Sequence, residues 1–149
     1  MNEKTLVLIK PDAVAKGLTG NIISDLDNLG LKMIGLKLVK VTDELAKAHY
    51  LEHKERPFFN DLILHITGKL HNNAPVIAIV YEGESAIEKI RKLAGSTNPE
   101  KAELKSLRGK YGRIHSETKC LETVIHSSDS AESAKREIAL WFAQDELIK

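Results

Sequence analysis

The sequence is poor in cysteine, in net charge and in long apolar runs, and each shortage excludes a class of protein. The one cysteine, Cys120, has no partner in the chain for a disulfide, which indicates a reducing compartment such as the cytoplasm. Lysines and arginines number 22 against 21 aspartates and glutamates, which gives no support for a nucleic-acid or membrane-surface partner. No apolar run approaches the roughly 20 residues of a membrane span, and no basic region leads into a signal-peptide core, so we expect no secretion signal.

What the chain does contain is the composition of an ordinary folded domain. It has 149 residues, of which 42% are hydrophobic and 29% are charged, and this length buries a sizeable core without disulfides. We find no internal repeat, low-complexity tract or interdomain linker. We therefore expect one domain over residues 1–149.

Apolar patterning predicts four strands and four helices. Strand signals cover Thr5–Ile9, Ile34–Leu38, Val76–Tyr81 and Leu121–Ile125. Helical spacing covers Asn21–Leu29 before Gly30, Leu45–Leu51 after Thr42, Ile87–Leu93 before Gly95, and Ala131–Trp141. We expect a turn at Asn98-Pro99, and mostly loop over Gly68–Asn73 and Glu100–Lys119.

The order of these elements limits the fold class. When the helix after Thr42 is left out, the order is strand–helix–strand twice, followed by a last helix. That order is the split βαβ pattern of an α+β, ferredoxin-like fold, here with extra helices. The pattern says nothing reliable about chemistry.

A histidine at the end of the last strand is the first candidate for chemistry. His126 follows the strand and precedes a helix that Asp129 or Ser130 can cap. Backbone N–H groups at a helix N-terminus favour anions, so His126 is placed to meet a phosphate. The alternative is that His126 is only a turn residue before a well-capped helix.

A carboxylate on the final helix strengthens the first interpretation. Glu137 borders the apolar stripe of that helix, whereas Arg136 points outward. Glu137 is therefore placed to hold one ring nitrogen of His126 and to leave the other free to attack. The alternative is a surface glutamate that pairs with lysine or arginine.

Three cations complete the set that a polyphosphate site needs. Lys10 ends the first strand, Arg91 lies near the end of a helix, and Arg108 lies in the polar region. Each alone is more often a solvated charge, but together they can neutralise a transferred phosphoryl group. Within Arg56–Phe59, one exposed phenylalanine can stack on a base; for Phe59 we favour a place in the core.

The remaining histidines carry no assignment. His49 and His53 are four residues apart, but no His/Cys/carboxylate set completes a metal site with them. His65, His71 and His115 lie in polar surroundings. There is no Walker-type or protein-kinase glycine-rich loop, so neither the P-loop ATPase nor the protein-kinase fold is expected.

In order and spacing, these segments resemble the nucleoside diphosphate kinase family, from Lys4 to about Leu147. The matching segments are Thr5–Val14, Gly17-Leu18, His49-Tyr50, Arg56–Phe59, Arg91, Gly95–Pro99, Leu107–Gly109, His126–Ser130, Glu137-Ile138 and Trp141-Phe142. The resemblance implies a ferredoxin-like αβ sandwich with an antiparallel sheet, assembled as a tetramer or hexamer. It also implies transfer of the γ-phosphate of ATP to a nucleoside diphosphate through a phosphohistidine, with Mg²⁺ held on the phosphates rather than in a protein cage.

The resemblance also assigns roles by matching position. It makes His126 the nucleophile, oriented by Glu137 with help from Ser128. It gives the phosphates to Lys10, Arg91 and Arg108 with Thr97 beside them, stacks Phe58 on the base, and packs Tyr50 near the phosphates.

Three features depart from the family pattern. Thr123 stands where the family usually has an asparagine that helps to bind the sugar 3′-hydroxyl, and Ser127 replaces a glycine or alanine. The loops at Leu64–Asn73 and Lys110–Leu121 are longer than in typical members. Two alternatives to the enzyme remain: a nucleotide-binding ferredoxin-like module that has lost phosphotransfer, and an interaction domain without a nucleotide site.

Overall fold

A four-stranded antiparallel sheet forms the centre of the computed structural model, which describes residues 2–149. Its strands are β1 (Asn2–Ile9), β2 (Lys32–Val39), β3 (Val76–Glu84) and β6 (Ile125–Ser127), in the spatial order β2-β3-β1-β6. With the four strands numbered along the chain, this order is 4-1-3-2, which confirms the ferredoxin-like prediction. The strands β4 (Arg113–Ile114) and β5 (Leu121–Glu122) pair separately as a small hairpin.

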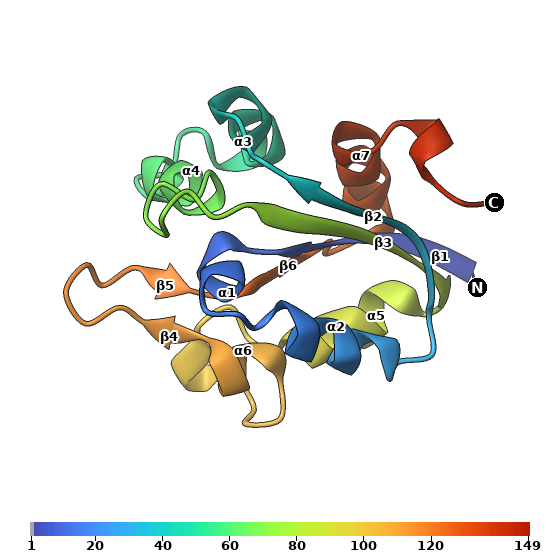
Figure 1. Cartoon of the computed structure of the whole chain (residues 1–149), viewed down its shortest axis with the longest axis horizontal. Coiled ribbons are helices and arrows are strands. Elements are labelled where there is room, and N and C mark those ends of the chain that lie inside the picture. Colours follow the sequence, from blue (N-terminus) through green and yellow to red (C-terminus); the bar gives the residue numbers. More distant parts are fainter. Residues whose placement is uncertain (1) are drawn as a thin grey trace.

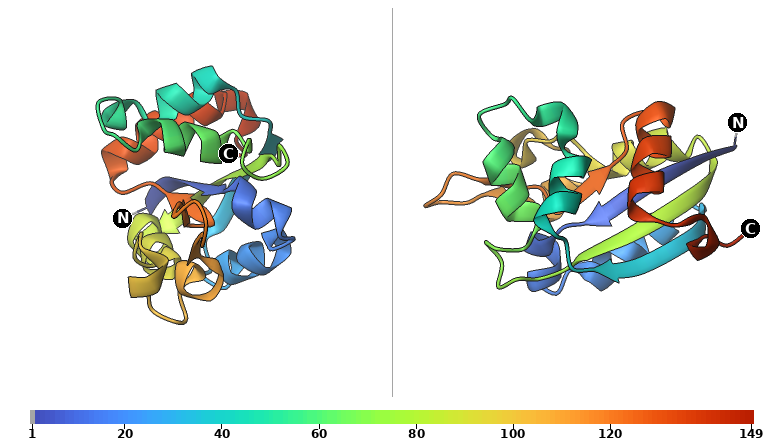
Figure 2. Two further views of the ribbon diagram at one scale, coloured as in Figure 1. Left: turned by 90° about the vertical axis from the view of Figure 1, so that its left-hand side faces the viewer. Right: turned by 90° about the horizontal axis from the view of Figure 1, so that it is seen from above.

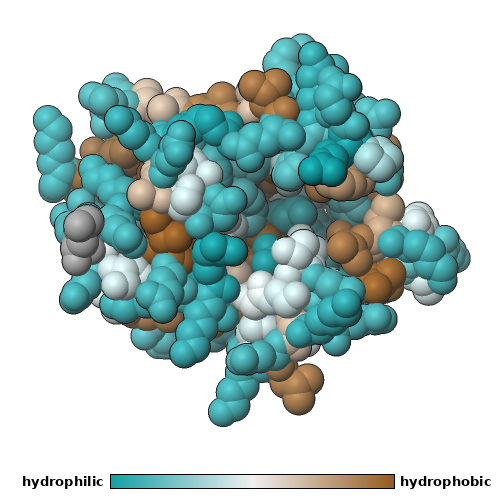
Figure 3. Space-filling view, turned by 180° about the vertical axis from the view of Figure 1, so that it is seen from behind, coloured by the Kyte–Doolittle hydropathy of each residue, from teal (hydrophilic) through white to brown (hydrophobic). Residues whose placement is uncertain are grey.

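Helices cover both faces of the sheet (Figures 1 and 2). One face carries α3 (Asp43–His49), α4 (Phe59–Ile66) and α7 (Ala131–Trp141). The other carries α1 (Pro11–Ala15), α2 (Thr19–Asp27), α5 (Ala86–Ala94) and α6 (Leu107–Tyr111). Short 3₁₀ turns lie at Leu51–His53, Pro99–Lys101 and Gln144–Glu146. The surface opposite to the view of Figure 1 is mainly hydrophilic and is hollowed near its middle (Figure 3).

The central strands are apolar on both sides because each face of the sheet has its own core. Along β1, Leu6 and Leu8 enter one core, while Val7 and Ile9 enter the other. This alternation follows from the two-residue period of a strand. It explains why Thr5–Ile9 reads as one apolar run, and β3 is built in the same way.

The predicted helix boundaries are confirmed at several ends. Thr42 Oγ1 accepts a hydrogen bond from Leu45 N–H and caps α3, and Ser130 Oγ accepts from Ser133 N–H and caps α7. Gly95 ends α5 with φ of 85°, a value that glycine adopts without the penalty of a side chain. No helix of residues 2–149 is long and apolar enough to cross a membrane.

The helices α1, α4 and α6 were not predicted, and the loop predicted next to α4 starts too early. Leu64 belongs to α4 and not to a Leu64–Asn73 loop. Phe59, Leu62, Ile63 and Ile66 have helical spacing and pack on the core of this face. The proline and the paired phenylalanines at the start of this helix favoured a loop instead. The prediction of a core position for Phe59 is confirmed.

The stretch from Glu100 to Lys119 is less irregular than expected, since it contains α6 and β4. Ser106 caps α6 by accepting a hydrogen bond from Gly109 N–H, and Leu107, the first residue of this helix, is fully buried. The expected last strand, Leu121–Ile125, is in fact broken into β5 and β6. The break falls at Val124, whose φ is 57°.

The alternating apolar pattern of Ile34, Leu36 and Leu38 correctly predicted a strand, but these three side chains do not share one buried face. A bulge between Met33 and Gly35 shifts the register, so Ile34 is buried while Leu36 and Leu38 are 53% and 68% exposed. Leu36 and Leu38 therefore lie as an apolar strip on an edge strand.

Candidate active site

A tight turn places His126 at the edge of the sheet. Ile125 N–H donates to Thr123 O over 2.6 Å, so Thr123–Ile125 form a γ-turn of the rare kind with positive φ at its centre. A β-branched valine in this region costs about 1–3 kcal/mol. Asp12 Oδ2 accepts from Val124 N–H, and Val124 O accepts from Lys10 N–H. These bonds hold the turn, and His126 then pairs with Leu8 of β1.

His126 and Glu137 form a charge-assisted hydrogen bond. His126 Nε2 lies 2.7 Å from Glu137 Oε1 and 3.2 Å from Oε2. Glu137 is 2% exposed, whereas the imidazole keeps 24% of its surface in solvent. An ionised carboxylate can only accept, so Nε2 carries the proton and Nδ1 carries the lone pair. The free nitrogen is therefore on the side of the ring away from the carboxylate.

A second histidine forms a wall beside His126, and sequence reasoning missed it. The His49 ring stands edge-to-face against the His126 ring with 4.5 Å between centroids. Its Nδ1 accepts a hydrogen bond from Trp141 Nε1–H over 3.1 Å. Burial lowers the pKa of His49 to about 2, so the ring next to His126 is uncharged. Helical spacing from Ala46 to His49 on the buried face of α3 was the available signal.

Lys10 is a buried cation whose head meets the turn before His126. The Lys10 side chain is buried, and its Nζ donates a hydrogen bond to Thr123 Oγ1 over 3.0 Å. Burial lowers the pKa of Lys10, the charge of Asp12 raises it, and the charge of Arg108 lowers it. The Thr123 hydroxyl, expected near the sugar, is thus bonded to Lys10.

Arg108 is fixed by three backbone carbonyls. Its guanidinium donates to Gly95 O, Ile125 O and Thr123 O at 2.8, 2.8 and 3.3 Å. Arg91 Nη1 donates to Asp129 O over 3.1 Å. Neither arginine is paired with a carboxylate in residues 2–149, so both keep their charge available for an anion.

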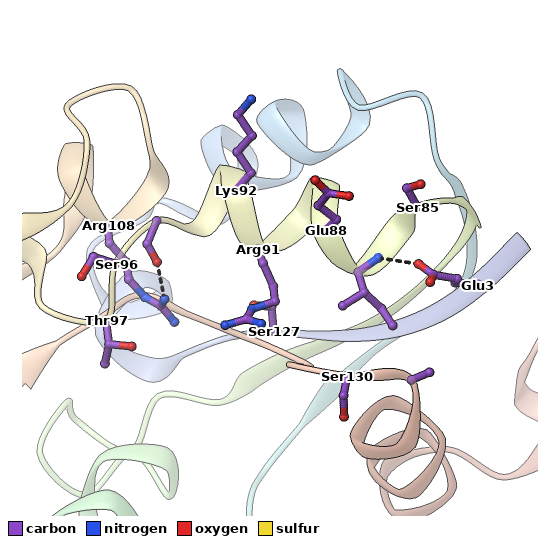
Figure 4. Close-up of a pocket in the computed structure, with 13 residues that line it drawn as sticks. Glu3, Ser85, Glu88, Arg91, Lys92, Ser96, Thr97, Arg108, Ser127 and Ser130 are labelled. Atoms are coloured by element: carbon purple, nitrogen blue, oxygen red, sulfur yellow. Dashed lines mark hydrogen bonds between the residues drawn. The ribbon is translucent and has the colours of Figure 1, made fainter. Parts of the chain in front are cut away.

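Two cavities meet at this site. The larger, of about 800 Å³, is lined by Arg91, Thr97, Arg108 and Ser127 among others (Figure 4). The smaller, of about 120 Å³, is lined by His49, Tyr50, His53, His126 and Glu137 among others. Ser127 lines both. The cations of α5 and α6 and the free side of His126 therefore face adjoining space.

Of the other predicted site residues, Phe58 is exposed, whereas Tyr50 and Ser128 are buried. Phe58 is 44% exposed just before α4, as an aromatic platform requires, and Tyr50 is buried at the end of α3. Ser128 is fully buried, and its described hydrogen bonds are both with Leu6, not with Glu137. The structure thus gives Ser128 a role in attaching the last strand to β1.

The donor atoms of the site do not form a cage for Mg²⁺. Within residues 2–149, the ligand atoms of His49, His126 and Glu137 alone cluster within 4.8 Å of one another, and hydrogen bonds already occupy both His49 Nδ1 and His126 Nε2. Mg²⁺ prefers oxygen ligands and near-octahedral geometry. The residues present fit a magnesium ion that is held by nucleotide phosphates.

Comparison with known proteins agrees with this geometry. The family model described as nucleoside diphosphate kinase matches residues 3–147. A nucleoside diphosphate kinase of Pyrococcus abyssi is 48% identical over 146 residues, covering 98% of this chain and 87% of the relative.

Solved structures show the same likeness. A nucleoside diphosphate kinase of Halobacterium salinarum in complex with CDP superposes with a TM-score of 0.89 at 40% identity, covering 100% of this chain and 93% of that one. A transition-state mimic of the enzyme from Borrelia burgdorferi, with vanadate and ADP, gives 0.88 at 36% identity, covering 99% and 91%.

Proposed function

This chain belongs to the nucleoside diphosphate kinase family, an enzyme family that transfers the γ-phosphate of a nucleoside triphosphate to a nucleoside diphosphate, and we propose that His126 carries the phosphate between the two nucleotides. The observation that carries this assignment is the 2.7 Å bond from His126 Nε2 to Glu137, which leaves Nδ1 with its lone pair. A neutral imidazole held by a buried carboxylate has the arrangement of an activated nucleophile.

The reaction has two displacement steps. In the first, the Nδ1 lone pair attacks the γ-phosphorus of ATP, the bond from that phosphorus to the bridging oxygen breaks, and ADP leaves with the electron pair. In the second, a terminal oxygen of the acceptor diphosphate attacks the phosphorus, and the bond to Nδ1 breaks. The histidine then regains its lone pair, so its protonation is the same before and after the cycle.

The cations stabilise the negative charge of the phosphoryl group that is transferred in both steps. Lys10, Arg91 and Arg108 are proposed to bind the phosphates, with Thr97 and the Tyr50 hydroxyl beside them. Desolvation is the main cause that lowers the pKa of both Lys10 and Arg108; the charge of Arg108 further lowers the pKa of Lys10, and the charge of Arg91 further lowers that of Arg108. A bound polyphosphate relieves that repulsion, which favours anion binding in the empty enzyme.

Substrate recognition divides between the base and the metal-bound phosphates. Exposed Phe58 is proposed to stack on the base, which tolerates many bases because every base has a π-face. Thr123, through Lys10, is proposed to support the sugar and phosphate end. Mg²⁺ is proposed to arrive on the nucleotide, and when bound it neutralises part of the triphosphate charge.

We further propose that residues 1–149 act as one nucleoside diphosphate kinase-like domain in a homo-oligomer, tetramer or hexamer, in the cytoplasm. The exposed Leu36 and Leu38 on the edge strand β2 support self-association. The single cysteine supports a reducing compartment.

The test of the nucleophile is His126→Ala. We expect loss of phosphate exchange between ATP and a diphosphate, loss of the acid-labile label from γ-labelled ATP, and an unchanged fold by circular dichroism. His115→Ala, a histidine on the separate hairpin, is the matched control and keeps full activity. Substantial exchange in the His126 variant overturns the assignment. A wild-type protein that binds ATP but takes up no label is instead the nucleotide-binding module without phosphotransfer.

Initial rates test the two-step route. Because one set of phosphate ligands serves both halves, the first product leaves before the acceptor enters. We therefore expect parallel lines in double-reciprocal plots against ATP at several diphosphate concentrations. Intersecting lines require a ternary complex and exclude the ping-pong route.

A further inference from the structure

A third cavity, of about 250 Å³, lies apart from the active site between α1, the end of α4 and the β4–β5 hairpin. It shares no lining residue with the two cavities described above. Most of its lining comes from the two segments, Leu64–Asn73 and Lys110–Leu121, that we expect to be longer than in typical members of the family; α1 with its C-cap residue Lys16, and Glu122, supply the rest. Three of the four histidines without a place in the reaction lie here, together with the one cysteine.

Two of these histidines face each other. Although the sequence suggested polar surroundings, His65 is only 6% exposed, and its Nδ1 lies 3.4 Å from Nε2 of His71. That separation lies beyond the usual 2.7–3.2 Å of a hydrogen bond from a ring N–H, so a direct bond between the two rings is weak. Two nitrogens bound to one tetrahedral zinc at about 2.0–2.1 Å lie about 3.3–3.4 Å apart. The pair is therefore spaced as two ligands of one ion.

The second nitrogen of His65 is left without a partner. Nε2 is buried and has no hydrogen-bond partner within residues 2–149, and such unpaired buried groups are few in proteins. With its lone pair on Nδ1, the His65 ring presents that lone pair to the gap beside His71. The Nε2 proton is then the one that metal-bound histidines donate to a carboxylate, carbonyl or water.

The polar groups around the pair are mostly engaged. Glu122 accepts from Lys16 and Arg113, and one oxygen of Asp12 accepts from Val124 N–H. His115 Nδ1 accepts from two backbone N–H groups of its own loop, so its Nε2 carries the proton and offers no lone pair. The remaining soft donor of the lining is the thiol of Cys120, which is partly exposed.

We propose that this cavity binds one zinc-like transition-metal ion through His65, His71 and the thiolate of Cys120, with water in the fourth position. Nitrogen and sulfur ligands select such ions over Mg²⁺, so this site is distinct from the magnesium that accompanies the nucleotide. Binding releases the Cys120 proton to solvent, since a thiol ligates as the thiolate.

The hairpin closes when the ion binds. The three donors do not yet lie within 4.8 Å of one another in the described chain, so Cys120 has to move inward. Two residue pairs join β4 and β5, the turn adds a bond from His115 N–H to Cys120 O, and this hairpin is a sheet separate from the central one. A two-stranded ribbon of this size is marginal by itself. Capture of Cys120 therefore fastens the hairpin to the end of α4.

The direct test is a titration of the whole, nucleotide-free protein with Co²⁺ as the probe. We expect one equivalent to bind with the intense visible absorption of a tetrahedral complex and a near-ultraviolet thiolate charge-transfer band, and Zn²⁺ to displace it. Absence of a tetrahedral complex overturns the proposal.

Variants locate the ion. His71 is part-exposed, so His71→Ala folds; it should weaken Co²⁺ binding more than about tenfold and leave phosphate exchange unchanged. Cys120→Ser should remove the charge-transfer band, whereas His115→Ala, in the same lining, should retain full binding. His126→Gln separates this site from the active-site histidines. Binding that survives His71→Ala, or that His126→Gln abolishes, places the ion elsewhere and refutes the site.

Discussion

At the scale of single residues, the hydroxyl of Thr123 determines where the head of Lys10 lies. The 3.0 Å bond from Lys10 Nζ occupies the hydroxyl oxygen, and Thr123 is 6% exposed. A short side chain that is already engaged reaches a sugar hydroxyl less directly than the family's usual asparagine. The residue thus links the cation to the turn, and we expect it to weaken one substrate contact.

Replacing this residue tests that contact. We expect Thr123→Asn to raise kcat/KM for ordinary nucleotides by about two- to tenfold, the equivalent of one neutral hydrogen bond. Nucleotides without a 3′-hydroxyl should gain less, and steady-state kinetics on both classes measures the difference. If neither class changes, the extended segment after Arg108 supplies the contact instead.

The buried neutral His49 makes stability depend on pH. Its folded pKa, near 2, lies below the unfolded value near 6.5, so its contribution is present above pH 6.5 and is lost as pH falls toward 2. Burial is the main cause, and the charges of His126, Arg136, Lys10 and His53 act in the same direction.

His49→Asn keeps an acceptor for Trp141 but does not titrate. Between pH 7 and 4.5 the wild type should lose roughly 2–3 kcal/mol more unfolding free energy than this variant. Urea denaturation at each pH measures the difference, and His65, present in both proteins, cancels. Equal pH slopes would show that His49 binds its proton as readily in the folded protein as in the unfolded chain.

Among the site residues, the sequence predicted those whose chemistry depends on their position relative to a strand end or a helix. His126 and Glu137 were found in this way because a 3.6-residue period places Glu137 toward the last strand. His49 was missed because its role is a ring contact between α3, β6 and α7, with His126 and Trp141. Sequence separation carries no signal of such a contact.

At the scale of elements, a helix or strand was predictable where its apolar residues repeat with the period of the face that it buries. The helix α5 repeats apolar residues along one face and stops at glycine, so both its type and its end were evident. In contrast, α6 has five residues and one fully buried side chain, too few for a period to appear. The break between β5 and β6 depends on the tertiary bonds of Asp12 and Lys10 to Val124.

The helix α6 tolerates no side chain at Gly109. A Cβ there would lie within 2 Å of the Glu103 carbonyl oxygen, which is backbone. We expect Gly109→Ala to cost about 1–3 kcal/mol, and to lower activity because Arg108 is the preceding residue. Gly20→Ala in α2 is the matched control, since no atom lies within 4 Å of its Cβ; it should be neutral or stabilising by up to about 1 kcal/mol. Thermal unfolding of both variants measures the difference in stability. Equal unfolding midpoints would show that α6 accommodates the added methyl group.

At the scale of the whole molecule, the sheet is open along β2. The C-terminal segment covers this edge at Ile34, whose carbonyl accepts from Ile148 N–H, and the exposed Leu36 and Leu38 follow beyond it. Natural proteins usually protect such an edge with charge or cover it with another chain.

A charge on this edge should therefore break the assembly. We expect Leu36→Glu combined with Leu38→Glu to lower the molar mass in solution by at least half, measured by light scattering after gel filtration. Leu51→Glu, at 61% exposure on another surface, is the control and should keep the wild-type mass. An unchanged mass in the edge variant would assign the subunit contact to a different surface.

The pairing of β1 with β6 also governs when the enzyme first becomes active during its synthesis. Leu8 pairs with His126, and Lys10 bonds to Thr123, 113 positions along the chain. Contacts so distant in sequence close late in folding. With His126 as the proposed phosphate acceptor and Glu137 as the carboxylate that holds it, we expect nascent chains and truncation products that lack Glu137 to consume no ATP. Activity is coupled in this way to completion of nearly the whole polypeptide.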